Sequence, residues 1–346
     1  MPAQTIPVLN AANVGDFVTK FNEYFTSNGD LASDLYYTLD DPGSPYYIGD
    51  RCQIRGGVIS KDILSTLNSG HVLQAGRGAK HYNPKEVLKL DGRYLDPKRW
   101  KIDLELDWED IFKEYIQRWE PALKGRVPHE SNNIPTLQTY FLTEIFRRAG
   151  NDLRQALFKG EYSATLADDG HLQWVDGFNK IIADEIAATN LTPLTGALVT
   201  SPSDVIPKIK KMYQALGQGW RDSNSAQILV ASNVWFHACE TTLMTNNQAY
   251  SMFTPEQAMT ALSRPLAFAA NVKLVHEPNL PEGGMMATVK ENLVVGYDSD
   301  KLASSLRMQE DKRIVRILAD GSACTQIRRV EELIDGAPLV VNEAMA

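Results

Sequence analysis

The chain has 346 residues, of which 43% are hydrophobic and 23% are charged, and its formal net charge at pH 7 is -8. This is the balance of an ordinary globular protein, long enough to bury sizeable cores in two or three subdomains. The net negative charge argues against a protein that grips nucleic-acid phosphates, because such binding requires a basic surface.

Cysteine content and the N-terminal sequence indicate the compartment. The three cysteines, Cys52, Cys239 and Cys324, lack the spacing of metal ligands, which predicts reduced thiols in a cytosolic protein. Residues 1–10 have neither the basic flank nor the apolar core of a signal peptide. No apolar run approaches the roughly 20 residues of a membrane helix, so we expect no membrane association.

Residues 1–40 are expected to form an N-terminal arm. A short amphipathic helix is predicted there, with Phe17, Phe21 and Tyr24 on an aromatic face. This much apolar surface on a small segment must dock onto the rest of the chain or onto a neighbouring molecule.

Residues 41–110 are expected to form an extended β loop with little core of its own. Turn-forming residues cluster along it, and a loop this long is uncommon unless it has a partner. Residues 101–108 alternate between charged and apolar side chains, which predicts a half-buried strand. Its charged side carries Lys101, Asp103, Glu105 and Asp107. These carboxylates could hold a hard cation, but a solvated or partner-facing charge row is the favoured interpretation.

Residues 133–160 are expected to form one long helix around which the rest of the chain is organised. Asn132 or Asn133 can cap its first turn, and Pro135 lies where its missing N–H costs nothing. Apolar residues recur at every fourth position, and Gly160 is a natural stop. At about 1.5 Å per residue the rod is roughly 40 Å long, so it needs a large surface to pack against.

The second half of the chain predicts a helix over 177–188 and then an α/β unit over 192–305. Helices of this unit are expected to begin at Ser203 and at Ser232 or Asn233, whose short side chains favour helix starts. Its strands are predicted over residues 226–232, 272–275, 285–289 and 293–297.

The tail is expected to return to β structure as a hairpin. Residues 313–319 and 323–329 read as strands on either side of Asp320 and Gly321. This pair favours a tight turn, because glycine tolerates the positive φ that such turns require.

The sequence shows no constellation of catalytic, cofactor-binding or metal-binding residues. The six histidines are scattered, and none makes the i, i+4 helical pair that metal sites favour. We therefore predict a protein that is not an enzyme, without cofactor or metal. A two-domain cytosolic enzyme remains an alternative, with a site built from His237, Cys239 and Asp298, since such groups need only meet in space.

Two groups of residues and the order of the parts carry a family resemblance. The long helix ends in Leu-Phe-Lys-Gly at 157–160 and is followed by Asp-Gly-Phe at 176–178; the closing β segment has Ile-Val-Arg at 314–316 and Ile-Arg-Arg at 327–329. With this order of parts, the chain resembles the major capsid proteins of tailed bacteriophages, which have the Hong Kong 97 capsid fold.

The resemblance implies an α+β fold with five parts. These are an N-terminal arm (1–40), an extended β loop (41–110), a long spine helix (133–160) within a peripheral domain (111–191 and 306–346), and an axial α/β domain (192–305).

The resemblance also implies a function. Copies of the chain would assemble into pentamers and hexamers of an icosahedral head around double-stranded DNA, in the host cytoplasm, and would remain in the virion. Implied partners are a separate scaffolding protein, a portal and a decoration protein. An encapsulin-like shell around protein cargo is an alternative with the same fold.

Twelve residues are expected at subunit interfaces: Phe17, Phe21, Tyr24, Arg51, Arg55, Lys61, Lys101, Asp103, Glu105, Asp107, Arg328 and Arg329. Some members of the family cross-link subunits through a loop lysine and an asparagine. The candidates here are Lys61, Lys80, Lys85, Lys89, Asn292 and Asn342.

Overall fold

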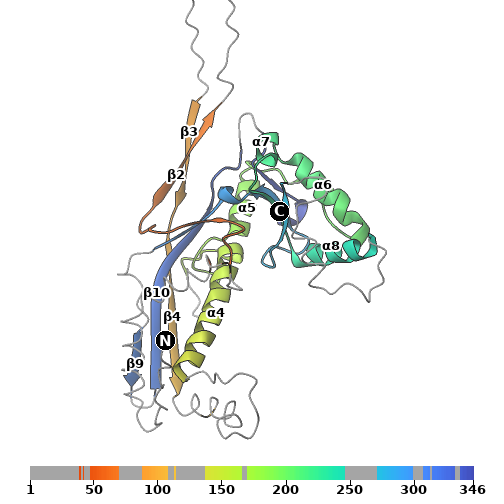
Figure 1. Ribbon diagram of the computed structural model, residues 1–346. Helices are drawn as coiled ribbons and strands as arrows, with labels where there is room; N and C mark the ends of the chain where they lie inside the picture. Colours follow the sequence, from red (N-terminus) through yellow and green to blue (C-terminus); the bar gives the residue numbers. More distant parts are fainter. Residues whose placement is uncertain are drawn as a thin grey trace, which may run out of the picture.

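A computed structural model describes residues 39, 42, 47–69, 88–107, 113, 137–165, 170–245, 271–298, 307–311, 314–331 and 336–346. Figure 1 shows three parts: a long sheet with helix α4 beside it, a two-stranded hairpin that projects from one end, and an α/β unit to one side. None of the described helices is long and apolar enough to cross a membrane.

The long sheet has five strands that come from distant parts of the sequence. Its order is β1-β8-β10-β4, and β9 also pairs with β10. The strands are β1 (Gln53–Arg55), β4 (Lys98–Asp107), β8 (Leu293–Tyr297), β9 (Arg307–Asp311) and β10 (Ile314–Ile327). Only β1 and β8 run parallel; the other pairs are antiparallel. The predicted strand at 101–108 is thus confirmed over residues 101–107 as part of β4, and residue 108 lies outside the described part.

The closing segment is one continuous strand, and the predicted hairpin at Asp320 and Gly321 is wrong. Both residues lie within β10, opposite Lys101 and Trp100 of β4. Gly321 has no positive φ. It is needed for another reason: a Cβ at this position would lie 2.5 Å from the Trp100 indole ring. A glycine in a strand can mark close approach of a neighbour as well as a turn.

The projecting hairpin consists of β2 (Asp62–Ser69) and β3 (Leu88–Leu95), paired antiparallel in a sheet of their own. A small core holds its base against the long sheet; its members are Val58, Leu64, Leu95, Val294 and Cys324. The predicted β excursion at 41–110 therefore contains a separate hairpin, but its flanking strands β1 and β4 belong to the long sheet.

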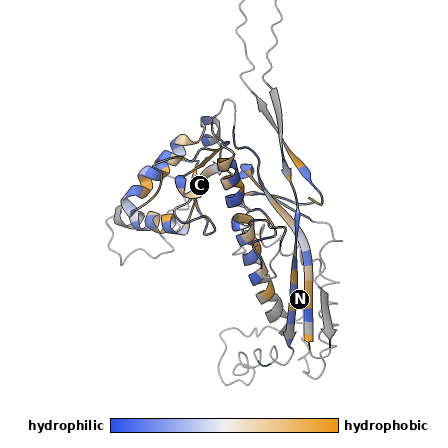
Figure 2. Ribbon diagram, turned by 180° about the vertical axis from the view of Figure 1, so that it is seen from behind, coloured by the Kyte–Doolittle hydropathy of each residue, from blue (hydrophilic) through white to orange (hydrophobic). Residues whose placement is uncertain are grey.

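Helix α4 (Leu137–Lys159) confirms the long predicted helix; residues 133–136 lie outside the described part. Ile145, Leu153 and Leu157 are buried along its length. The helix ends at Lys159, as expected. Glycine is needed at the next position because a Cβ there would lie 2.4 Å from the carbonyl oxygen of Val175. Figure 2 shows hydrophobic and hydrophilic residues interleaved along α4 and along the long sheet beside it.

Helix α5 (Phe178–Ala187) confirms the helix predicted at 177–188 and packs on α4. The rings of Phe158 and Phe178, both fully buried, meet edge to face with centroids 5.3 Å apart. Edge-to-face aromatic pairs stabilise a contact beyond the area that they bury.

The α/β unit is built on a four-stranded sheet of order β11-β7-β5-β6. Its strands are β5 (Ala226–Val230), β6 (Lys273–His276), β7 (Met285–Val289) and β11 (Leu339–Val341). Its helices are α6 (Val205–Ala215), α7 (Gln218–Arg221) and α8 (Ser232–Thr245). Short 3-10 turns occur at Pro202–Asp204, Lys290–Asn292 and Glu343–Met345. All five residues of β5 are buried, as expected for a strand covered on both faces.

The two sheets exchange strands, which changes the predicted boundaries of the α/β unit. Strand β8 lies within the predicted range 192–305 but pairs in the long sheet, whereas β11 lies in the tail but pairs with β7. One hydrophobic core accordingly joins both sheets with α4 and α5. Leu39, at the end of the predicted arm, is buried in this core.

Candidate assembly surfaces

The base of the hairpin carries an exposed apolar surface, the hairpin patch, formed by Ile63 and Tyr94. Ile63 and Tyr94 lie directly opposite each other on β2 and β3 and are 51% and 49% exposed. Ile59, in the segment before β2, is 60% exposed. Large apolar side chains that gather on a surface mark interaction sites, so the patch is a candidate for contact with another molecule.

Two of the residues expected at subunit interfaces lie beside this patch. The Lys61 Nζ lies 4.4 Å from the centroid of the Tyr94 ring, within the range of a cation–π contact. Arg55, at the end of β1, forms a 2.8 Å ion pair with Asp62, and both side chains are partly exposed. The patch thus has a polar rim, as protein interfaces commonly do.

The charged row on β4 is exposed, as its sequence alternation predicts. Lys101, Asp103, Glu105 and Asp107 are all exposed. Lys101 pairs with Asp103 at 2.5 Å, and Arg316 of β10 pairs with Glu105 at 3.1 Å. Cations of the same chain therefore neutralise part of the row. Among the described residues, no group of three or more His, Cys, Asp or Glu side chains is placed to hold a metal ion.

Arg51 lies in a buried polar cluster instead of on the surface. Its side chain is only 14% exposed, and its Nε lies 3.0 Å from Oε2 of the fully buried Glu277. The guanidinium also donates to the carbonyl oxygens of Tyr47 and His276, at 2.7 and 3.0 Å. Arg51, which the sequence places at a subunit interface, therefore makes these contacts within its own subunit.

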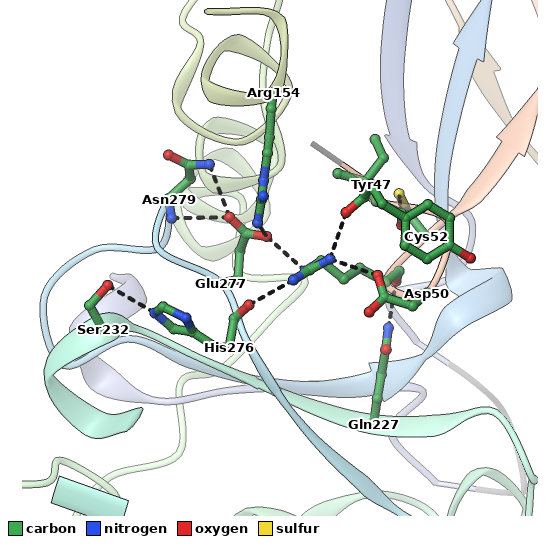
Figure 3. A network of polar contacts seen from close by, with 11 residues as sticks. Tyr47, Asp50, Cys52, Arg154, Gln227, Ser232, His276, Glu277 and Asn279 are labelled. Atoms are coloured by element: carbon green, nitrogen blue, oxygen red, sulfur yellow. Dashed lines mark hydrogen bonds and ion pairs between the residues drawn. The ribbon is translucent and has the colours of Figure 1, made fainter. Parts of the chain in front are cut away.

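The same carboxylate binds a second arginine from α4 (Figure 3). Arg154 donates from Nη2 to Oε2 of Glu277 at 2.9 Å, and its side chain is 11% exposed. The other oxygen, Oε1, accepts from the backbone N and from Nδ2 of Asn279, at 3.1 and 3.0 Å. Both oxygens of the buried carboxylate are therefore satisfied, as a buried charge requires. We call Arg51, Arg154, Glu277 and Asn279 the joint cluster.

The surroundings of the joint cluster are buried but carry no reactive arrangement. Burial, and then the charge of Glu277, raise the pKa of the Cys52 thiol well above its usual range. Burial lowers the pKa of His276, whose ring stacks on Trp235 and whose Nε2 lies 3.1 Å from the Ser232 hydroxyl. A thiol that holds its proton and a neutral imidazole are what a structural interior favours.

Sequence reasoning missed the joint cluster because its partners are far apart in the chain. Arg154 and Glu277 are 123 positions apart. A single glutamate after an apolar strand and a single arginine on a helix have no spacing that pairs them. The chain order of the elements gave no sign that α4 meets the end of β6.

Arg328 and Arg329 are half-buried and also make contacts within the chain. Arg328 donates from Nη2 to Oε1 of Gln53 at 2.9 Å, and burial lowers the pKa of its guanidinium. The Arg329 guanidinium lies 5.6 Å from the centroid of the Trp220 ring. The remaining expected interface residues, Phe17, Phe21 and Tyr24, lie outside the described part of the chain.

The two asparagines named as cross-link candidates are both buried and hydrogen-bonded. Asn292 donates to the Thr288 hydroxyl and to the Arg329 carbonyl oxygen, at 3.0 and 2.9 Å. Asn342 donates to the Gly283 carbonyl oxygen and accepts from the Met285 N–H, at 2.8 and 2.9 Å. Neither amide therefore lies at the surface of the subunit.

The residues of the alternative enzyme hypothesis come from different parts of the fold. His237 and Cys239 lie on α8 of the α/β unit, whereas Asp298 follows β8 of the long sheet. Burial raises the pKa of the Cys239 thiol, which opposes the thiolate that a nucleophile needs. The geometry thus gives this hypothesis no support.

Comparisons with known proteins find similarity in structure but not in sequence. No family model matches the chain, and no curated protein matches it. A chain of the satellite phage P4 procapsid with its size determination protein aligns over 91% of this chain and 98% of its own, with a TM-score of 0.50 and 14% identity. The capsid of Myoviridae phage XM1 aligns over 86% and 91%, with a TM-score of 0.51 and 8% identity.

A third example is the capsid of an empty GTA particle, which aligns over 85% of this chain and 88% of its own, with a TM-score of 0.51 and 10% identity. These alignments cover most of each chain, so the similarity extends over the greater part of the fold. The chain therefore has a phage capsid fold.

Proposed function

We propose that the chain is the major capsid protein of a tailed bacteriophage, and that its copies form the pentamers and hexamers of an icosahedral head around double-stranded DNA. One observation carries this proposal beyond the fold: the hairpin projects from the subunit and exposes the hairpin patch at its base. Such a feature is readily explained if it lies on a neighbouring copy, where its apolar side chains are removed from water.

In this proposal the surfaces have separate tasks. The hairpin patch, with Arg55 and Lys61 on its rim, packs on an adjacent subunit. The predicted arm, with Phe17, Phe21 and Tyr24, clasps another neighbour, and the α/β unit meets its copies around the symmetry axes. The charged row of β4 sets the register of neighbours more than the strength of their contact, because exposed ion pairs contribute little energy.

The net charge also suits a shell around DNA. At -8 per subunit, the average surface repels phosphate and does not grip a genome that must later leave. A scaffolding protein, a portal and a decoration protein are the further partners of the complete head in this proposal, and the virion is the location that it implies.

Electron microscopy of the purified full chain in negative stain tests the proposal. We expect rings of five or six subunits or closed shells. Small dispersed globules alone would overturn it, and would favour the enzyme hypothesis. Shells formed in a phage-infected host are the second test. If they contained a defined protein cargo and no DNA, the proposal of a phage head would be wrong and an encapsulin-like compartment would be favoured.

A shortened hairpin tests whether the projecting end of β2 and β3 adds to the proposed contact, because it leaves Ile63 and Tyr94 in place. Removal of residues 50–100 would also delete β1 and part of β4, so a cleaner variant replaces residues 67–90 with a short turn and keeps the small core at the hairpin base. We expect a folded subunit with an unchanged unfolding temperature that no longer closes shells. Normal shells from this variant would refute a role for the projecting end of the hairpin.

A further inference from the structure

The joint cluster connects three separate parts of the subunit. Arg51 precedes β1 of the long sheet, Arg154 lies on α4, and Glu277 follows β6 of the α/β unit. Gln227 of β5 adds a fourth contact, since its Nε2 donates to the Arg51 carbonyl oxygen. One carboxylate group is therefore the common partner of elements from both sheets and from the long helix (Figure 3).

The hydrophobic core that spans the same region specifies the angle between these parts less sharply than directional contacts do. Burial of apolar surface is non-directional, so packed layers can slide or tilt while they keep most of their contact area. The hydrogen bonds from Arg154 to the carboxylate and from the Arg51 guanidinium to the His276 carbonyl oxygen are directional and weaken when donors move out of line. In a buried site, such a network selects one arrangement over others that a core alone would tolerate.

We propose that Glu277, through Arg51 and Arg154, sets the angle between the long sheet and the α/β unit, and so determines the curvature of the shell. Only the second part of this inference, the effect on the curvature of the shell, rests on the proposed function. If copies tile through the hairpin at one end and the α/β unit at the other, their relative angle decides how neighbours meet. A small tilt, repeated around a ring and between rings, then changes the diameter at which the shell closes.

Single replacements of the arginines test the proposal and leave the buried Glu277 carboxylate with one cationic partner. Arg154→Met removes the contact with α4 but leaves Arg51 on Glu277, and Arg51→Met does the reverse. Either variant keeps one cation beside the buried anion, whereas loss of both would leave an uncompensated charge. Ile228→Val is the matched control, because it weakens the separate core of the α/β unit and touches no member of the joint cluster.

The first readout is the distance between two spin labels on dissociated subunits. Arg99→Cys on β4 and Lys210→Cys on α6 place exposed labels on the two parts, in a background where Cys239 is replaced by serine. We expect one narrow distance peak for the otherwise unchanged chain and for Ile228→Val. Arg51→Met and Arg154→Met should lose the single narrow peak. A narrow, unshifted peak in both arginine variants would overturn the inference, whatever shells they form.

The second readout is the diameter of assembled shells under the electron microscope. We expect one diameter for the unchanged chain and a mixture of diameters or open shells for the arginine variants. If a methionine variant does not fold, the same two measurements are made on Arg154→Lys. This variant keeps the charge but loses the planar guanidinium geometry. An altered distance peak with shells of normal diameter would refute the link to curvature only. Absence of shells from the unchanged chain would count against the proposed function, while the distance measurement would still test the joint.

Discussion

Gly321 of β10 lies directly opposite Trp100 of β4, and the indole ring occupies the space that a side chain at position 321 would need. Trp100 in turn packs against the core that joins the two sheets. The glycine therefore allows β10 to continue as one strand from its pairing with β4 into its pairing with β8.

Replacement of Gly321 by alanine is expected to destabilise the subunit by about 1–3 kcal/mol, because the added methyl group must displace the ring in a packed site. Chemical denaturation of the dissociated subunit measures this change. Asp320→Ala is the control: its side chain is exposed, so we expect a change within about 0.5 kcal/mol.

A double-mutant cycle separates this explanation from a turn glycine. If the ring is the obstacle, Gly321→Ala should cost much less when Trp100 is replaced by leucine, because the two effects are then coupled. An unchanged cost in the leucine background would show that the backbone itself requires glycine at this position.

Local patterns predicted most of the separate elements. Strands β7 and β8 match their predicted ranges, because Gly283 and Gly284 precede the first short apolar run and polar residues at 290–292 and 298–300 bound the second. Helix α4 ends as expected because a glycine follows an unbroken apolar period. These features depend on residues that are neighbours in the sequence.

Long-range relationships could not be predicted in the same way. The sequence around Gly321 fits both a turn and a close approach, and only the position of Trp100, far away in the chain, decides between them. The placement of β8 and β11 in opposite sheets depends on which edges are free to pair. Glu277 has no spacing that identifies Arg51 and Arg154 as its partners.

The two buried thiols should make stability fall at high pH. Burial raises the pKa of Cys324 to about 12, and that of Cys52 further, from an ordinary value of 9.0. Both thiols stay protonated in the folded state but ionise on unfolding. Their contribution is therefore complete below pH 9 and is lost as the pH rises from there, by about 1 kcal/mol per thiol between pH 9 and 10.

Urea denaturation at pH 8, 9 and 10 measures this loss, and the variant Cys52→Ala with Cys324→Ala is the comparison. Other groups also titrate in this range. The quantity to compare is therefore the slope of the unfolding free energy against pH in the two chains. Equal slopes for both chains would show that these thiols do not contribute. The half-buried Cys239 should remain the most reactive toward a thiol reagent in the folded state.

Assembled particles are expected to give only monomer bands on a denaturing gel. Asn292 and Asn342 are buried, and their amides already bond to groups of the same chain. A cross-link through either would require these hydrogen bonds to break and the side chain to reach the surface. A ladder of covalent oligomers would contradict this, and its cross-linked peptides, identified by mass spectrometry, would show which asparagine had moved.

Polar replacement of the hairpin patch should block assembly without weakening the fold. Ile63 and Tyr94 are about half exposed in the subunit, so Ile63→Ser with Tyr94→Ser removes little buried surface from the monomer, and we expect its unfolding temperature to change by only a few degrees. If a neighbouring copy covers both side chains, the double variant loses roughly 2–4 kcal/mol at each contact, which repeats over the whole shell. Light scattering of assembling subunits measures the loss of assembly.

Tyr162→Ser is the matched control, since Tyr162 is a similarly exposed aromatic residue outside the hairpin. Equal assembly of the double variant and the control would show that the patch is not a subunit contact.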